Sequence, residues 1–104
     1  MTNQIQNSIK YVIYCVDYQP IFPSCEIQEN LLIQKAEFEE LNVVGTYTDK
    51  PHKTNSFQSA LHLIKQDKAQ GILVWDYSMI PHTTEVDSLI TTNKIKDIKP
   101  FITN

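Results

Sequence analysis

The run YVIYCV, from Tyr11 to Val16, is the stretch of sequence that most clearly indicates the fold. It is apolar without interruption, which is typical of a strand that is buried on both faces of a parallel sheet. A second run, ILVW from Ile72 to Trp75, has the same character. Because such a sheet needs helices on both faces, the two runs predict an α/β domain.

The segments around these runs predict three helices and two further strands. Ser24 is placed to cap a first helix, and Ser56 to cap a second. The expected elements, in chain order, are a strand at 11–16, a helix from Cys25 to about Leu41 that Asn42 ends, a strand from Val43 to Tyr47, a helix with the apolar stripe Phe57, Ala60, Leu61 and Ile64, a strand at 72–75, a helix carrying Val86, Leu89 and Ile90, and a strand from Ile98 to Ile102. Strands that alternate with helices in this way form parallel sheets through right-handed crossovers.

The first predicted helix is apolar on two sides. At 100° per residue, one side collects Ile27, Leu31, Phe38 and Leu41, and the other collects Leu32, Ile33 and Ala36. One side can pack on the sheet, which leaves the other for a neighbouring helix or another chain. We take Leu32, Ile33 and Ala36 as the candidate interaction surface, and coverage by the chain's own loops as the alternative.

Composition narrows the classes of function. The net charge is -3 and the pI is about 5.5, and all nine basic residues are lysines. Nucleic-acid binding draws its affinity from clustered cations, so a free-standing nucleic-acid binder is disfavoured. The polar start of the chain lacks the features of a signal peptide, and no apolar run is long enough to span a membrane. We therefore expect a cytoplasmic protein in which Cys15 and Cys25 are reduced thiols.

Four segments together resemble the catalytic domain of serine recombinases, the resolvase/invertase family. Family members have a strand ending in Tyr-x-Arg-Val-Ser, a helix opening with Ser-Leu-Glu-x-Gln, an Arg-Pro-x-Phe helix start and a strand continuing into Lys-Leu-Asp-Arg-Leu-Ser-Arg. The corresponding segments here are IYCVDY at 13–18, SCEIQ at 24–28, TNSFQSAL at 54–61 and GILVWDYSMIPH at 71–82. The resemblance implies one three-layer α/β domain over residues 10–104, with an open parallel sheet of about four strands in the order 2-1-3-4. Residues 1–9 are then a polar N-terminal tail.

The motif positions that carry the family's chemistry have all changed. In the family, a serine attacks a DNA phosphodiester and arginines stabilise the charge that develops. The serine position falls on Tyr18, or on Asp17 if the strand is shifted by one residue, and the preceding arginine falls on Val16 or Cys15. The remaining positions are Thr54 for the helix-start arginine, and Ser78, Met79 and His82 for the Asp and two Arg of the last motif. Since losing one such positive group can cost on the order of 10² to 10³ in rate, the resemblance implies a pseudoenzyme.

The chain also ends soon after its last predicted strand, where family members continue into a dimerisation helix and a DNA-binding domain. Our leading hypothesis is a non-catalytic resolvase-like protein that acts by protein contact, as a regulator of a serine recombinase on a mobile element or by binding itself. One alternative is a residual DNA-binding module of site-specific recombination.

The other alternative is a small enzyme or phospho-acceptor domain. Asp17 and Asp76 would lie at the carboxyl ends of adjacent strands, where open parallel sheets bind ligands, and His52 and His82 would lie on the same edge. Carboxylate and imidazole groups are metal ligands, but their spacing here matches no metal motif. We therefore expect neither a metal nor a cofactor.

Overall fold

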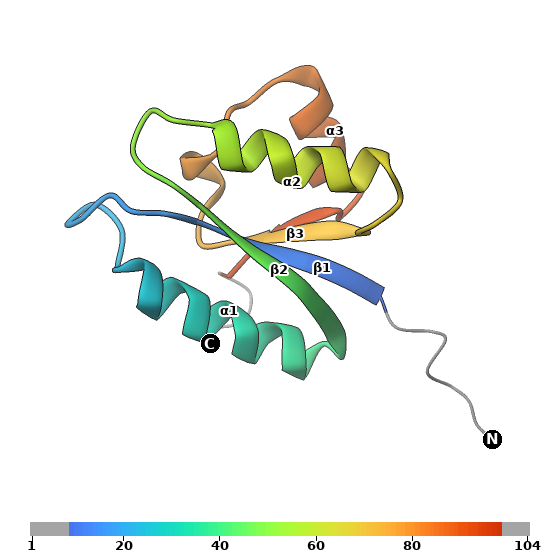
Figure 1. The fold of residues 1–104 in the computed structure, drawn as a ribbon, viewed down its shortest axis with the longest axis horizontal. Coiled ribbons are helices and arrows are strands. Elements are labelled where there is room, and N and C mark those ends of the chain that lie inside the picture. The colour runs from blue at the N-terminus through green and yellow to red at the C-terminus, as the bar shows by residue number, and fades with distance from the viewer. Residues whose placement is uncertain (1–8, 99–104) are drawn as a thin grey trace.

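The apolar run at Tyr11 becomes the centre of a four-stranded sheet with helices on both faces (Figure 1). The computed structural model describes residues 9–98. Its strands are β1 (Ile9–Val16), β2 (Leu41–Asp49), β3 (Gly71–Val74) and β4 (Ile95–Asp97). All neighbouring strands are parallel and their order is β2-β1-β3-β4, which confirms the predicted fold class and strand order.

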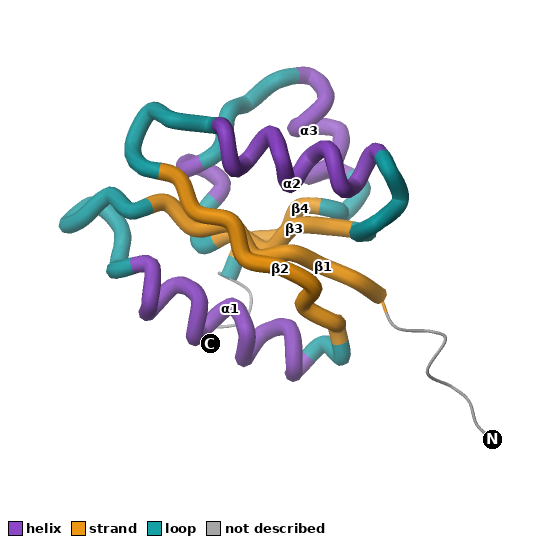
Figure 2. The backbone as a smooth tube through the Cα atoms, in the orientation of Figure 1, coloured by secondary structure: helices purple, strands orange, loops and turns teal. Residues whose placement is uncertain are grey.

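The helices divide between the two faces of the sheet (Figures 1 and 2). They are α1 (Cys25–Phe38) on one face, with α2 (Asn55–Lys65) and α3 (Thr84–Thr91) on the other. Side chains of β1 alternate between the two cores: Ile13 packs with Leu32 of α1, whereas Val12 packs with Phe57 of α2. Within residues 9–98, no helix has the length and apolar character that crossing a membrane requires.

The start of α1 is fixed to the end of β1 by polar contacts. Ser24 caps the helix as predicted, because its hydroxyl accepts a hydrogen bond from the backbone N–H of Ile27 at 3.3 Å. Gln28 is fully buried, and its side-chain amide donates to the carbonyl oxygens of Val16 at 2.9 Å and Pro23 at 2.8 Å. The loop between β1 and α1 is therefore held at both of its ends.

Three predicted boundaries are wrong. The first helix ends at Phe38 rather than near Leu41, because Glu40 adopts a positive φ of 61° and the chain turns into β2. The second helix is not capped by Ser56: it begins at Asn55, and the carboxylate of Asp49 bonds its first turn. The last strand lies at Ile95–Asp97, before the predicted segment, of which residues 99–102 fall outside the described part of the chain.

The predicted interaction surface on α1 is also wrong. Leu32 and Ala36 are 0% and 1% exposed, and Ile33 is half-buried, because this side of the helix packs on the sheet. On the opposite side, Ile27 is 49% exposed. Both sides of α1 are apolar, and the way the helix packs on the sheet decides which side is buried and which is exposed.

Candidate functional site

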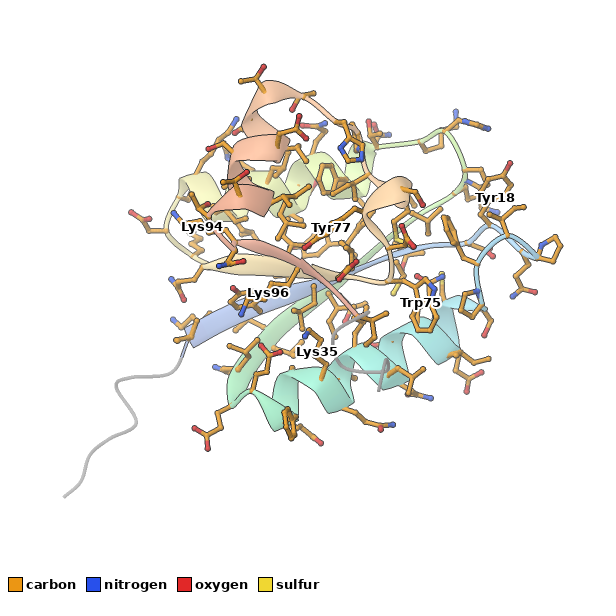
Figure 3. The ribbon with its side chains drawn as sticks, turned by 180° about the vertical axis from the view of Figure 1, so that it is seen from behind. Tyr18, Lys35, Trp75, Tyr77, Lys94 and Lys96 are labelled. Atoms are coloured by element: carbon orange, nitrogen blue, oxygen red, sulfur yellow. The ribbon has the colours of Figure 1, made fainter. Side chains whose placement is uncertain are left out.

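The loops that follow β1, β2 and β3 surround a cavity of about 420 Å³ at the carboxyl edge of the sheet. This volume lies in the range of about 300 to 1,000 Å³ that is usual for small-molecule sites. Its lining consists of Val16, Tyr18, Ile21 and Phe22 from the first loop, Pro51, His52, Lys53 and Thr54 from the second, and Ser78, Met79, Ile80 and Pro81 from the third. Figure 3 shows Tyr18 at the opposite end of the molecule from Lys94, which precedes β4.

The cavity collects most of the positions that the family resemblance singles out. Val16, Tyr18, Thr54, Ser78 and Met79, which come from three separate segments, all line it. His82 follows the third segment without lining the cavity, and its imidazole contacts the carbonyl oxygen of Tyr77 at 3.0 Å and the carboxylate of Asp87 at 3.2 Å. Of the positions in the shifted register, Cys15 is buried and Asp17 is exposed, and neither lines the cavity.

Aromatic and aliphatic side chains form most of the cavity wall. The ring of Tyr18 stands edge-on to Phe22 and to His52, with a centroid distance of 6.1 Å in each pair. Ile80, which is 4% exposed, and Met79 belong to the apolar core under α2 and α3. Such a lining favours the apolar part of a ligand over a highly charged one.

A buried carboxylate occupies the beginning of α2 beside this cavity. Asp49, which is 6% exposed, accepts hydrogen bonds from the Tyr14 hydroxyl at 2.7 Å and from the backbone N–H groups of Ser56 and Phe57 at 2.9 and 3.0 Å. Burial opposes its charge, but these three donors outweigh burial and hold the pKa of Asp49 below its ordinary value. The N–H groups that a helix start can offer to an anion are therefore already bonded to a negative group.

Sequence reasoning missed Asp49. It lies at the end of an edge strand in a polar stretch, and nothing local distinguishes it from the other acidic residues. The one available signal is its position at the end of a strand, a few residues before a helix that has no acidic residue in its first turn. Burial also raises the pKa of its partner Tyr14, and the hydrogen bond to Asp49 raises it further, so Tyr14 remains a neutral donor.

Neither of the two predicted aspartates, Asp17 and Asp76, lines the cavity. Asp17 is exposed after β1, and its backbone N–H donates to the carbonyl oxygen of Asp49 at 2.9 Å. Asp76 is half-buried and accepts a hydrogen bond from the N–H of Ser78 at 2.8 Å, which caps a 3₁₀ turn at Tyr77–Met79. Across residues 9–98, no three side chains of the His, Cys, Asp or Glu type gather closely enough to hold a metal ion.

The two cysteines are free thiols that are poorly suited to nucleophilic chemistry. Burial raises the pKa of the Cys15 thiol to about 12, and burial also raises the pKa of Cys25. The reactive thiolate is therefore scarce at neutral pH for both residues. Cys15 acts as a small core residue beneath α1, as predicted.

A larger hollow, of about 570 Å³, lies along the outer side of α2 beside Tyr47, His62 and Lys65. It collects none of the predicted site residues. We therefore place the candidate site at the carboxyl edge of the sheet.

Comparison with known proteins supports the fold. No family model and no curated protein matches the sequence. Among solved structures, the C-terminal catalytic domain of ISC1926 TnpA, an IS607-like serine recombinase, matches with a TM-score of 0.66 and 20% sequence identity over 86% of this chain and 68% of that chain. The likeness confirms a serine recombinase-like fold, and at this level of identity it concerns the fold alone.

Proposed function

Because the chain has the fold of a serine recombinase catalytic domain, we propose that it is a non-catalytic protein that acts by protein contact. Its proposed partner is a serine recombinase of the same mobile element, which it regulates by binding. A second copy of this chain is the alternative partner. The observation that carries the proposal is the chemistry of the cavity at the carboxyl edge of the sheet.

That cavity is a poor environment for phosphoryl transfer. Its lining contains Lys53 but no arginine, since the chain has none. Lysine lacks the planar guanidinium group with which arginine donates two parallel hydrogen bonds to one phosphate. The carboxylate of Asp49 accepts the backbone N–H groups of Ser56 and Phe57, so these donors are not available to stabilise the charge of a transition state. Tyr18 thus has a hydroxyl at the cavity but no arginine to stabilise a reacting phosphate.

A protein contact is supported by apolar side chains around the β1–α1 loop. Ile21 is 62% exposed, Ile27 49% and Tyr18 38%. Complete burial of one such side chain contributes about 1.5 to 3 kcal/mol. These three residues lie within ten positions of the chain, and a contiguous exposed apolar patch is a feature of protein contact sites. This loop and the first turn of α1, which holds Ile27, replace Leu32, Ile33 and Ala36 as the proposed contact surface.

The test is co-expression of the chain with a serine recombinase from the same genome, followed by size-exclusion chromatography with light scattering. We expect one complex that contains both proteins. Ile21→Lys and Ile27→Lys should each remove it, because burying an unpaired charge in an apolar contact is costly. Val44→Lys is the matched control, since Val44 is 45% exposed but lies within β2.

Each outcome bears on a different part of the proposal. A complex that survives Ile21→Lys and Ile27→Lys would remove the β1–α1 loop as the contact surface. A homodimer of the chain alone that Ile21→Lys converts to a monomer would identify the partner as a second copy. If the chain remains monomeric and binds no recombinase, action by contact with either partner is wrong.

A further inference from the structure

We infer that the cavity between the three loops binds a small apolar molecule that carries one carboxylate. This activity goes beyond the proposed protein contact and does not depend on it. Two features carry the inference: an apolar wall, and a set of polar side chains at the same cavity that have no side-chain partner within residues 9–98.

The apolar wall suits an aromatic or aliphatic body. Tyr18 and Phe22 meet edge to face, and Met79 lies in the third of the lining segments. An aromatic ligand placed among such side chains gains both area burial and ring contacts. Tyr18 is 38% exposed, so the wall is accessible from solvent.

The polar groups suit one anionic head. Lys53, Thr54 and Ser78 all line the cavity. Across residues 9–98 the side chain of Lys53 forms no ion pair, and those of Thr54 and Ser78 form no hydrogen bond, even though Thr54 holds the N-cap position of α2. One ammonium and two hydroxyl donors match the acceptor atoms of a carboxylate.

Charge limits the head group to a single negative charge. The buried carboxylate of Asp49 accepts the N–H groups of Ser56 and Phe57, so the beginning of α2 contributes a negative group instead of free donors. A phosphate dianion would meet this charge with only one lysine to balance it. The single negative charge of a carboxylate is balanced by the single positive charge of Lys53.

The probes are 4-phenylbutyrate, the neutral 4-phenylbutanol and phenyl phosphate, each added at millimolar concentration to the isolated ¹⁵N-labelled chain. In two-dimensional NMR spectra, we expect 4-phenylbutyrate to shift the amide signals of Tyr18, Thr54 and Met79. The alcohol should bind the same residues about tenfold more weakly, which corresponds to the loss of one charged contact. Phenyl phosphate should also bind more weakly than the carboxylate.

Two lysines of the same loop provide a matched pair of variants. Lys53→Gln should weaken 4-phenylbutyrate about tenfold and leave the alcohol unchanged, whereas Lys50→Gln should leave both unchanged, since Lys50 does not line the cavity. The inference is overturned if no cavity residue shifts, if phenyl phosphate binds more tightly, or if the two variants behave alike. None of these results would affect the proposed protein contact, because each is measured without a partner.

Discussion

The two ends of the parallel sheet are built in opposite ways. At the amino end, Tyr11 donates its hydroxyl to the carbonyl oxygen of Asn93 at 3.0 Å, and Lys10 and Gln70 exchange two hydrogen bonds of 2.7 Å. At the carboxyl end, three loops enclose a cavity in which polar side chains lack partners within residues 9–98. The amino end is filled by side chains and closed by hydrogen bonds, whereas the carboxyl end holds the cavity for which we propose a ligand. The cavity therefore lies at the edge where parallel sheets usually bind their ligands.

Gly71→Ala should disrupt the packing at the amino end of the sheet and have the largest effect on stability. A Cβ at Gly71 would collide with the Tyr11 ring and with the carbonyl oxygen of Lys94. Because one obstacle is backbone, relief requires a strand shift, and we expect a loss of about 3 kcal/mol in the free energy of unfolding. Urea denaturation followed by circular dichroism measures it.

Gly45→Ala is the control for this variant. A Cβ there would meet one atom of the Tyr47 ring at 3.3 Å, and that ring is only partly buried, so it can move. We expect a clearly smaller loss. Equal losses for the two variants would show that the amino end is not the more tightly filled region.

Asp49→Asn should destabilise the protein by about 2 kcal/mol, because the charged acceptor of three buried hydrogen bonds becomes a neutral amide. Asp17→Asn, at an exposed carboxylate, should leave stability nearly unchanged. Thermal unfolding of both variants makes the comparison. A loss at Asp17 as large as that at Asp49 would contradict the role of Asp49 in holding α2.

The pH dependence of stability should sharpen the same point. The folded-state pKa of Asp49 is lowered, so its contribution is complete above the unfolded value of about 3.9 and disappears as pH falls through the folded value. Asp49→Asn should therefore lose less stability than the wild type below about pH 4. Burial opposes the charge of Glu39, but Lys35 and Lys96 outweigh burial and lower its pKa. The Asp49→Asn variant should therefore still lose some stability in acid, because Glu39 is unchanged in it. Identical acid profiles would contradict this linkage.

Ile21→Ser should have only a small effect on stability. Its side chain is 62% exposed at the cavity, so we expect a change within about 0.5 kcal/mol. Urea denaturation checks this value alongside Gly71→Ala. A loss comparable to that of Gly71→Ala would mean that the cavity rim supports the fold and is not free for binding.

The strongly apolar runs made the sheet predictable from sequence. β1 and β3 have unbroken apolar patterns, and the resemblance to serine recombinases supplied the order of the strands. The end of α1 and the beginning of α2 were harder to predict from the sequence. Glu40 turns the chain through a positive φ without a glycine, and the cap of α2 comes from Asp49, which precedes that helix by several residues. The local sequence pattern indicates neither the turn at Glu40 nor the bond from Asp49 to α2.

The candidate site was predictable in its location and not in its chemistry. Tyr18, Thr54 and Met79, which were singled out by matching motif to motif, line one cavity because each lies where a strand gives way to a loop or helix. The accessible side of α1 was assigned wrongly because its apolar residues lie on both sides in similar number. Which side meets the sheet depends on packing, as the buried Leu32 and exposed Ile27 show.

The most direct test of the account is whether the isolated chain reacts with DNA. Duplex DNA that carries the crossover sequence of the partner recombinase would be incubated with the chain and separated on a denaturing gel, with the active recombinase as the positive control. The account predicts no covalent protein–DNA adduct and no strand cleavage by this chain. An adduct that disappears in Tyr18→Phe would contradict it and would show that the cavity still performs phosphoryl transfer.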